Sequence, residues 1–220
     1  MPDTAIFDVD GTLVDTNYHH ALAWHRAFRR YDITRPLWQI HRTIGMGGDQ
    51  LVPHLVGEQI NNDHGEALQE AWVEEFDQLI DEIQPFEGSR QLLEDVKSRG
   101  FRLVLASSGK KKHVEKFLEL IGGTDIVDAW TTSDDVSNSK PAPDLVVTAL
   151  ERVEGVSGVL IGDSTWDCVA AGKLQVPTVA VRTGGFSPEE LIEAGASRVF
   201  DSLQELRENL DDTPLARPHQ

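Results

Sequence analysis

The sequence contains a single cysteine, Cys168, among 220 residues. One cysteine cannot form an internal disulfide bond, and it excludes a zinc site built from cysteines. The sequence also lacks an apolar run long enough to cross a membrane. Its start, Met1-Pro2-Asp3-Thr4, has no basic segment followed by an apolar one, so we expect no signal peptide. These absences predict a cytoplasmic protein without a membrane partner.

Positive charge is scarce as well. Lysine and arginine number 20 against 37 aspartates and glutamates, which gives a formal net charge of −17 at pH 7. Nucleic acids and anionic membranes require partners that neutralise negative charge, so we expect neither. The same acidity repels a phosphorylated molecule at long range, and a site for one would need local positive charge. A hydrophobic content of 40% is typical of a globular protein with its own core.

Two aspartates follow the first apolar stretch. Ala5-Ile6-Phe7 has the character of a strand, and it continues into Asp8-Val9-Asp10-Gly11-Thr12. Residues two apart on a strand point to the same face, so Asp8 and Asp10 project together from its end. The glycine permits a sharp turn there, and the threonine adds a hydroxyl group. Paired carboxylates repel unless a cation or a shared proton compensates, so the segment favours a metal-assisted site over a simple acidic turn.

Three later segments also combine an apolar element with polar residues. An apolar stretch at 101–106 ends in Ser107-Ser108-Gly109, and one at 156–161 ends in Gly162-Asp163-Ser164-Thr165-Trp166-Asp167. Lys140 lies in the loop 137–144, before an apolar helical pattern. Taken alone, Ser107 or Asp163 could cap a helix, and Lys140 could be a solvated loop lysine. Their joint occurrence at successive strand ends favours one common site.

The order of the elements predicts an α/β fold with a doubly wound parallel sheet. Strands and helices alternate after residue 100, and such alternation places ligands at the carboxyl ends of the strands. We expect strands near 102–106, 127–131, 158–161, 178–181 and 198–200, and helices near 111–120, 143–152, 165–173, 188–193 and 203–209. Residues 17–84 show helical spacings only, as in Trp24 and Phe28 or Leu68 and Trp72.

These four segments, in this order, resemble the motifs of the haloacid dehalogenase-like hydrolase superfamily, and specifically its magnesium-dependent phosphatases. The resemblance covers nearly the whole chain. It implies a Rossmann-like core formed by residues 1–16 and 85–210 and a helical cap inserted at residues 17–84. Residues 211–220 are polar and contain proline, so we expect a flexible tail.

The resemblance also implies roles for single residues. Asp8 would be the nucleophile that forms an aspartyl-phosphate, and Asp10 the general acid and base. Ser107 would donate a hydrogen bond to a phosphoryl oxygen, and Lys140 would place positive charge against the same group. Mg²⁺ is the implied cofactor. Its expected ligands are the carboxylates of Asp8 and Asp163, the main-chain carbonyl of Asp10, and Asp167, either directly or through water.

Further residues are expected at the substrate. The main-chain N–H groups near Ser108 and Gly109 would assist Ser107 and Lys140 in binding the phosphoryl group. Thr12, in the segment that contains Asp8 and Asp10, is also expected to contact the substrate. From the helical region we expect the loop that contains Gly47 and Gly48 to face the substrate. For His20 we favour packing at the hinge or in the cap, with substrate contact as the alternative.

The resulting hypothesis is a phosphatase that acts on a small phosphorylated metabolite, similar to phosphoglycolate or sugar-phosphate phosphatases. A first alternative is phosphoryl transfer as in β-phosphoglucomutase, which needs a cationic clamp for a second phosphate that the cap does not obviously supply. A second is a binding protein on the same fold without activity. Residues 17–84 contain no lysine, so a Schiff-base phosphonatase has no candidate residue. The sequence contains no feature that predicts an oligomeric state.

Overall fold

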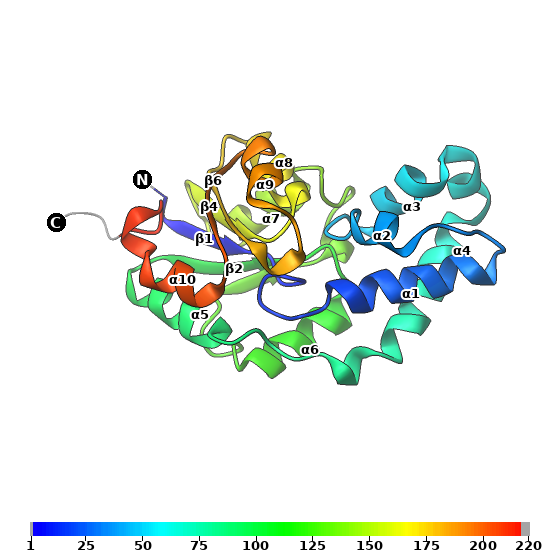
Figure 1. The fold of residues 1–220 in the computed structure, drawn as a ribbon. Coiled ribbons are helices and arrows are strands. Elements are labelled where there is room, and N and C mark those ends of the chain that lie inside the picture. Colours follow the sequence, from blue (N-terminus) through cyan, green and yellow to red (C-terminus); the bar gives the residue numbers. More distant parts are fainter. Residues whose placement is uncertain (1, 217–220) are drawn as a thin grey trace.

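The computed structural model describes residues 2–216 (Figure 1). Six parallel strands form one sheet in the order β3-β2-β1-β4-β5-β6. The strands are β1 (Thr4–Phe7), β2 (Arg102–Ala106), β3 (Ala129–Thr131), β4 (Gly158–Gly162), β5 (Thr178–Val181) and β6 (Ala196–Phe200). The three central strands are almost continuously buried, as expected for strands covered on both faces. The prediction of a doubly wound parallel sheet is confirmed.

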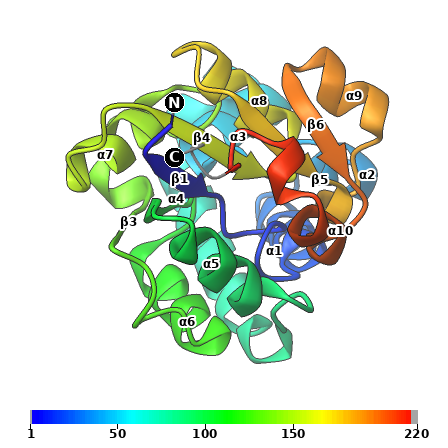
Figure 2. The same cartoon turned by 90° about the vertical axis from the view of Figure 1, so that its left-hand side faces the viewer.

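Helices cover both faces of the sheet (Figure 2). Alternate strand residues face opposite layers, so Ala5 and Phe7 pack on one side and Ile6 on the other. The first side is covered by α5 (Ser89–Ser98), α6 (Lys111–Ile121) and α10 (Leu203–Glu208). The second side is covered by α7 (Asp144–Arg152), α8 (Thr165–Gly172) and α9 (Pro188–Glu193).

A helical region lies beyond one end of the sheet (Figure 1). It consists of α1 (Asn17–Arg30), α2 (Leu37–His41), α3 (Gly48–Val56), α4 (Glu58–Asp77) and a short 3-10 helix, Ile80–Glu82. Helices α1 and α4 pack together, with the rings of Trp24 and Trp72 stacked at 5.3 Å. The two segments that connect this region to the sheet lie side by side, and Asp15 N donates to Gln84 O at 3.0 Å. This helical region, from Asn17 to Glu82, is called the cap below.

One segment differs from the expectations. Residues 211–216 are packed on the core instead of forming a free tail: Leu210–Asp212 is a 3-10 helix, and Leu215 is fully buried. Burial of Leu215 in the main core explains why the polar composition of this segment was misleading. Residues 217–220 lie outside the described residues. No helix among residues 2–216 is long and apolar enough to span a bilayer.

Candidate active site

The sheet brings the ends of its three central strands to one level. Phe7 of β1 pairs with Leu105 of β2 and with Ile161 of β4. The residues that follow these strands therefore emerge at one edge, where the strand order reverses between β2 and β4 on either side of β1. In open α/β sheets this is the position at which ligands bind.

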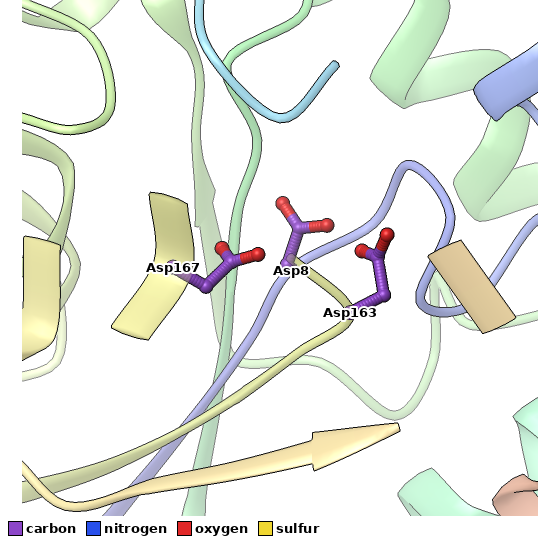
Figure 3. Close-up of side chains that lie close together, drawn as sticks. All are labelled: Asp8, Asp163 and Asp167. Carbon is purple, nitrogen blue, oxygen red and sulfur yellow. The ribbon is translucent and has the colours of Figure 1, made fainter. Parts of the chain in front are cut away.

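Three carboxylates meet at this edge (Figure 3). Asp8, Asp163 and Asp167 each offer an oxygen within 4.8 Å of the others, and all three are buried. Lys140 is fully buried beside them: its Nζ forms ion pairs with Asp8 and, at 2.7 Å, with Asp167 Oδ1. It also donates to Ala106 O at 3.0 Å. Three carboxylates and one ammonium group leave two negative charges in a buried space.

The hydroxyl of Thr12 shows that the carboxylates are crowded. Its Oγ1 lies 3.1 Å from Asp8 Oδ2 and 2.8 Å from Asp163 Oδ1, yet a hydroxyl has one proton and can donate to only one of them. Asn17 Nδ2 donates to the other oxygen of Asp163 at 2.9 Å. The carboxylate cluster is therefore short of donors for its negative charge.

The pKa values reflect the same excess of buried negative charge. Burial raises the pKa of Asp163 to about 7, with a further contribution from the charge of Asp167. Burial also raises the pKa of Asp8 well above its ordinary value, although Lys140 opposes the shift. Burial disfavours the charged form of Lys140, but Asp167 and Asp8 outweigh it and raise the lysine pKa. The cluster takes up protons when nothing else supplies positive charge.

This arrangement fits a hard divalent cation. The donors are all oxygens, which Mg²⁺ prefers, and a charge of two would balance the excess of the cluster. Asp167 is held by Ser164, whose Oγ donates to Oδ2 at 2.5 Å, while its Oδ1 has the ion pair with Lys140 but no well-directed hydrogen bond. Asp8 and Asp163 are thus the residues best placed for direct binding.

Asp10 has separate partners. Its side chain is absent from the carboxylate cluster: Oδ1 lies 2.8 Å from His20 Nε2, and Oδ2 accepts from Ser107 Oγ at 2.7 Å. Ser107 in turn accepts from Gly109 N at 2.9 Å, and the His20 ring stacks on Phe76 at 4.0 Å. Ser107 was expected to donate to a phosphoryl oxygen, whereas here its proton is directed to Asp10.

A cavity lies between this edge and the cap. Its volume is about 40 Å³, which is enough for a few waters. Its lining comprises Asp8, Asp10, Ser108 and Gly109 from the core and His20, Trp24, Ile44, Gly45, Met46, Gly48 and Trp72 from the cap. Of the expected substrate-binding residues, His20, Gly48, Ser108 and Gly109 therefore line the cavity, whereas Thr12, Gly47, Ser107 and Lys140 do not.

The cap loop is closed against the core. Ser108 Oγ donates to Gly45 O at 3.2 Å, and Ser139 N donates to Asp49 Oδ2 at 3.0 Å. A Cβ atom on Gly47 would lie 2.3 Å from Ser139 Oγ, so Gly47 permits close contact between the cap and the lysine loop. Gly47 thus faces Ser139 in this structure, and its contact with a substrate stays a prediction.

Several residues near the cluster were not predicted. Asn17 binds Asp163, and Asp49 ties the cap to the core, as described above. A Cβ atom on Gly184 would lie 1.9 Å from Asp163 Oδ2. Thr183 Oγ1 donates to Gly11 O at 2.5 Å and fixes the neighbouring turn. The pair Gly184-Gly185 after β5 was the available sequence signal for this close approach.

Gly184→Ala tests how tightly the cluster is held. The added methyl group displaces the Asp163 carboxylate, so we expect at least about a tenfold weaker Mg²⁺ affinity, in the range seen when the support of metal ligands is removed. Calorimetric Mg²⁺ titration measures it. Gly172→Ala is the matched control because nothing lies within 4 Å of its Cβ position. Equal affinities in both variants would contradict the assigned place of Gly184.

Comparison with known proteins identifies the family. Residues 5–181 match the family of haloacid dehalogenase-like hydrolases. The chain belongs to this family. A hydrolase from Pseudomonas syringae has a similar structure, with a TM-score of 0.89 and 32% identity, over 95% of this chain and 98% of that one.

Two curated relatives are also similar. Validoxylamine A 7'-phosphate phosphatase from Streptomyces hygroscopicus subsp. limoneus is 25% identical over 94% of this chain and 97% of its own length. Pyrophosphatase PpaX from Bacillus thuringiensis (strain Al Hakam) is 26% identical over 81% of this chain and 82% of its own length. The predicted superfamily is confirmed, and the protein is an enzyme of the phosphatase class, a phosphoric monoester hydrolase.

Proposed function

We propose that the enzyme hydrolyses a small phosphate monoester with Asp8 as the nucleophile, Asp10 as general acid and base, and Mg²⁺ as cofactor. One observation carries the proposal: Asp8 is held between a buried ammonium group and a second carboxylate, in a cavity that Asp10 also lines. The relatives named for a 7'-phosphate and for pyrophosphatase activity support a phosphoryl substrate.

The cofactor would be held by the carboxylates of Asp8 and Asp163 and by the carbonyl oxygen of Asp10. Asp167 would stay paired with Lys140. When bound, Mg²⁺ offsets the excess negative charge of the cluster and polarises the phosphoryl oxygens. Lys140 keeps Asp8 oriented and carries positive charge at the same end of the cavity. The N–H group of Ser108 lies at the cavity, where a phosphoryl oxygen could accept from it, whereas that of Gly109 already donates to Ser107 Oγ.

The reaction would proceed in two steps. In the first, an Asp8 oxygen attacks phosphorus, the bond from phosphorus to the ester oxygen breaks, and that oxygen takes a proton from Asp10. In the second, a water attacks phosphorus while Asp10 accepts its proton, the bond from phosphorus to Asp8 breaks, and phosphate leaves. Asp8 and Asp10 are restored, so atoms and charges balance over the cycle.

The environment of Asp10 suits the second step directly. Burial alone would raise its pKa, but the hydrogen bonds from His20 and Ser107 outweigh burial and lower the pKa to about 2. Asp10 is therefore an ionised base before substrate arrives. A phosphoryl dianion placed beside it raises its pKa again, which supports uptake of the proton that the first step uses.

Replacing His20 should change the pH profile of the reaction. His20→Asn removes the group that contributes most to lowering the Asp10 pKa, so that pKa rises towards its ordinary value. The rate of the step that needs ionised Asp10 is then lost at a higher pH, and the acidic limb of kcat moves up by about one pH unit. His64→Asn, at an exposed cap position, is the control. A profile that does not move would contradict this role of His20.

Phosphate release from phenyl phosphate by the purified enzyme tests the proposal. We expect turnover in Mg²⁺ and its loss in chelator. Turnover that is indifferent to chelator would contradict the assignment of the cofactor, and absence of turnover under both conditions would contradict the proposed activity.

A further inference from the structure

The cap supplies an apolar wall to the cavity. Its side chains there include Trp24, Ile44, Met46 and Trp72, each no more than 8% exposed. The indole rings of Trp24 and Trp72 stack nearly parallel, with an interplanar angle of 12°. Opposite this wall lie the carboxylates of the core. The part of a substrate that is remote from phosphorus therefore meets aromatic and aliphatic surface.

Two buried polar atoms of the cap residues that line the cavity, Trp72 Nε1 and His20 Nδ1, have no hydrogen-bond partner among the described residues. The Nε1–H of Trp72 is buried and has no acceptor among the described residues. A buried indole N–H normally finds a hydrogen-bond acceptor, because leaving it unpaired costs free energy. Trp72 itself lines the cavity, so an oxygen of a bound molecule that reaches this N–H would satisfy it.

Apart from His20, whose Nε2 is bound to Asp10, the cap offers no basic side chain to the cavity. It contains no lysine, and none of its arginines lines the cavity. Each arginine is engaged elsewhere: Arg26 and Arg30 pair with Glu75, Arg29 donates to Thr34, Arg35 donates to Leu55 O, and Arg42 pairs with Glu190. A second anionic group on a substrate would thus find no arginine or lysine of the cap to pair with.

The three lysines that follow Gly109 in the chain are also paired. Lys110 contacts Asp134, Lys111 contacts Glu115, and Lys112 contacts Asp77. The positive end of α3 reaches the cavity at Gly48, but Asp49 places a carboxylate in its first turn.

From these features we infer the class of alcohol that the enzyme releases: an uncharged one that carries hydroxyl groups on an apolar frame, as in sugar or other polyol monophosphates. This inference rests on the proposed phosphatase activity and narrows its substrate. A carboxylate or second phosphate at the wall would be desolvated without a counter-charge, which is strongly unfavourable. With the cap loop displaced from Ser108 and Ser139, a neutral polyol can instead pack its carbon frame on Trp24 and Trp72 and offer an oxygen to the Trp72 N–H.

Isosteric pairs of phosphate esters test the inference. 2-Hydroxyethyl phosphate and 2-phosphoglycolate differ mainly in a carboxylate, and so do glycerol 3-phosphate and 3-phosphoglycerate. Each compound competes against phenyl phosphate hydrolysis in excess Mg²⁺, so every compound gives an inhibition constant even when it is not turned over. We expect the uncharged member of each pair to compete at least about tenfold better.

The outcomes separate the two proposals. Absence of phenyl phosphate turnover rejects the phosphatase proposal and this inference with it. Turnover of phenyl phosphate together with equal or better competition by the carboxylate members rejects the inference alone. Pyrophosphate and a sugar bisphosphate belong in the same series, and competition by either that exceeds that of glycerol 3-phosphate also rejects it.

Two variants assign the selectivity to the wall. Trp72→Phe keeps a ring but removes the N–H, so we expect kcat/KM to fall about fivefold more for glycerol 3-phosphate than for phenyl phosphate, which has no hydroxyl group. Met46→Lys adds a cation, so the preference within each pair should shift towards the carboxylate member. Circular dichroism of both variants checks folding. Unchanged ratios in folded variants would overturn the assignment.

Discussion

Asp8→Asn is expected to lower turnover of phenyl phosphate by about four orders of magnitude or more, the scale of loss when a nucleophile is removed. The amide is a poor nucleophile, and the remaining residues cannot form the covalent intermediate. The fold should remain, because Lys140 keeps its ion pair with Asp167 when Asp8 loses its charge. The measurement is a steady-state assay combined with a thermal melt.

The control for this variant is Asp15→Asn. Asp15 lies in the same N-terminal segment, but it is exposed and outside the carboxylate cluster. We expect activity close to that of the parent protein. Turnover by Asp8→Asn within tenfold of the parent would contradict the role of Asp8, whereas equal losses in both variants would point to damage of the segment.

Removal of Mg²⁺ should have the second-largest effect, and its size should depend on pH. Asp163 has a pKa of about 7 in the folded protein against an ordinary value of 3.8. Between these values the folded state binds more protons than the unfolded state. The stability of the metal-free protein contributed by Asp163 therefore falls as the pH rises through this window. Asp8 shifts in the same direction.

The expected result is a larger stabilisation by Mg²⁺ at alkaline than at acidic pH. At about pH 8 the ion relieves the repulsion among carboxylates and should raise Tm by several degrees, whereas at about pH 5 it competes with protons and raises Tm less. Activity in chelator should be lost at both pH values. Differential scanning calorimetry with and without Mg²⁺ gives the comparison.

Asp163→Asn provides the matched variant for this effect. It removes one of the buried charges, so in chelator at about pH 8 we expect a Tm above that of the parent. Its gain from Mg²⁺ should nearly vanish. A variant that melts below the parent in chelator and still gains stability from Mg²⁺ would contradict the assignment of Asp163 as a ligand.

The sequence predicted the sheet and the convergence of Asp8, Ser107 and Asp163 because both follow from local patterns. Buried strands appear as apolar runs, and polar residues directly after them must lie at the carboxyl edge of a parallel sheet. The role of Lys140 was predicted from the resemblance, and the structure places its ammonium group between Asp8 and Asp167.

What the sequence did not predict depends on contacts between distant elements. The hydrogen bond of Asn17 to Asp163 joins the start of the cap to the residue that follows β4. The sequence separation of the two residues gives no sign of this contact. The engagement of Ser107 with Asp10 follows from the detailed turn geometry. Leu215 is buried by core residues far away in the chain, which composition at the C-terminus cannot show.

The most direct test of the account is to trap the covalent intermediate. The Asp10→Asn variant is mixed with substrate and Mg²⁺, quenched, and treated with borohydride, which reduces an acyl phosphate to an alcohol. Peptide mass spectrometry should then find homoserine at position 8 in a substrate-dependent manner. Unmodified Asp8 during ongoing turnover, or a label at another residue, would contradict the proposal that Asp8 attacks phosphorus.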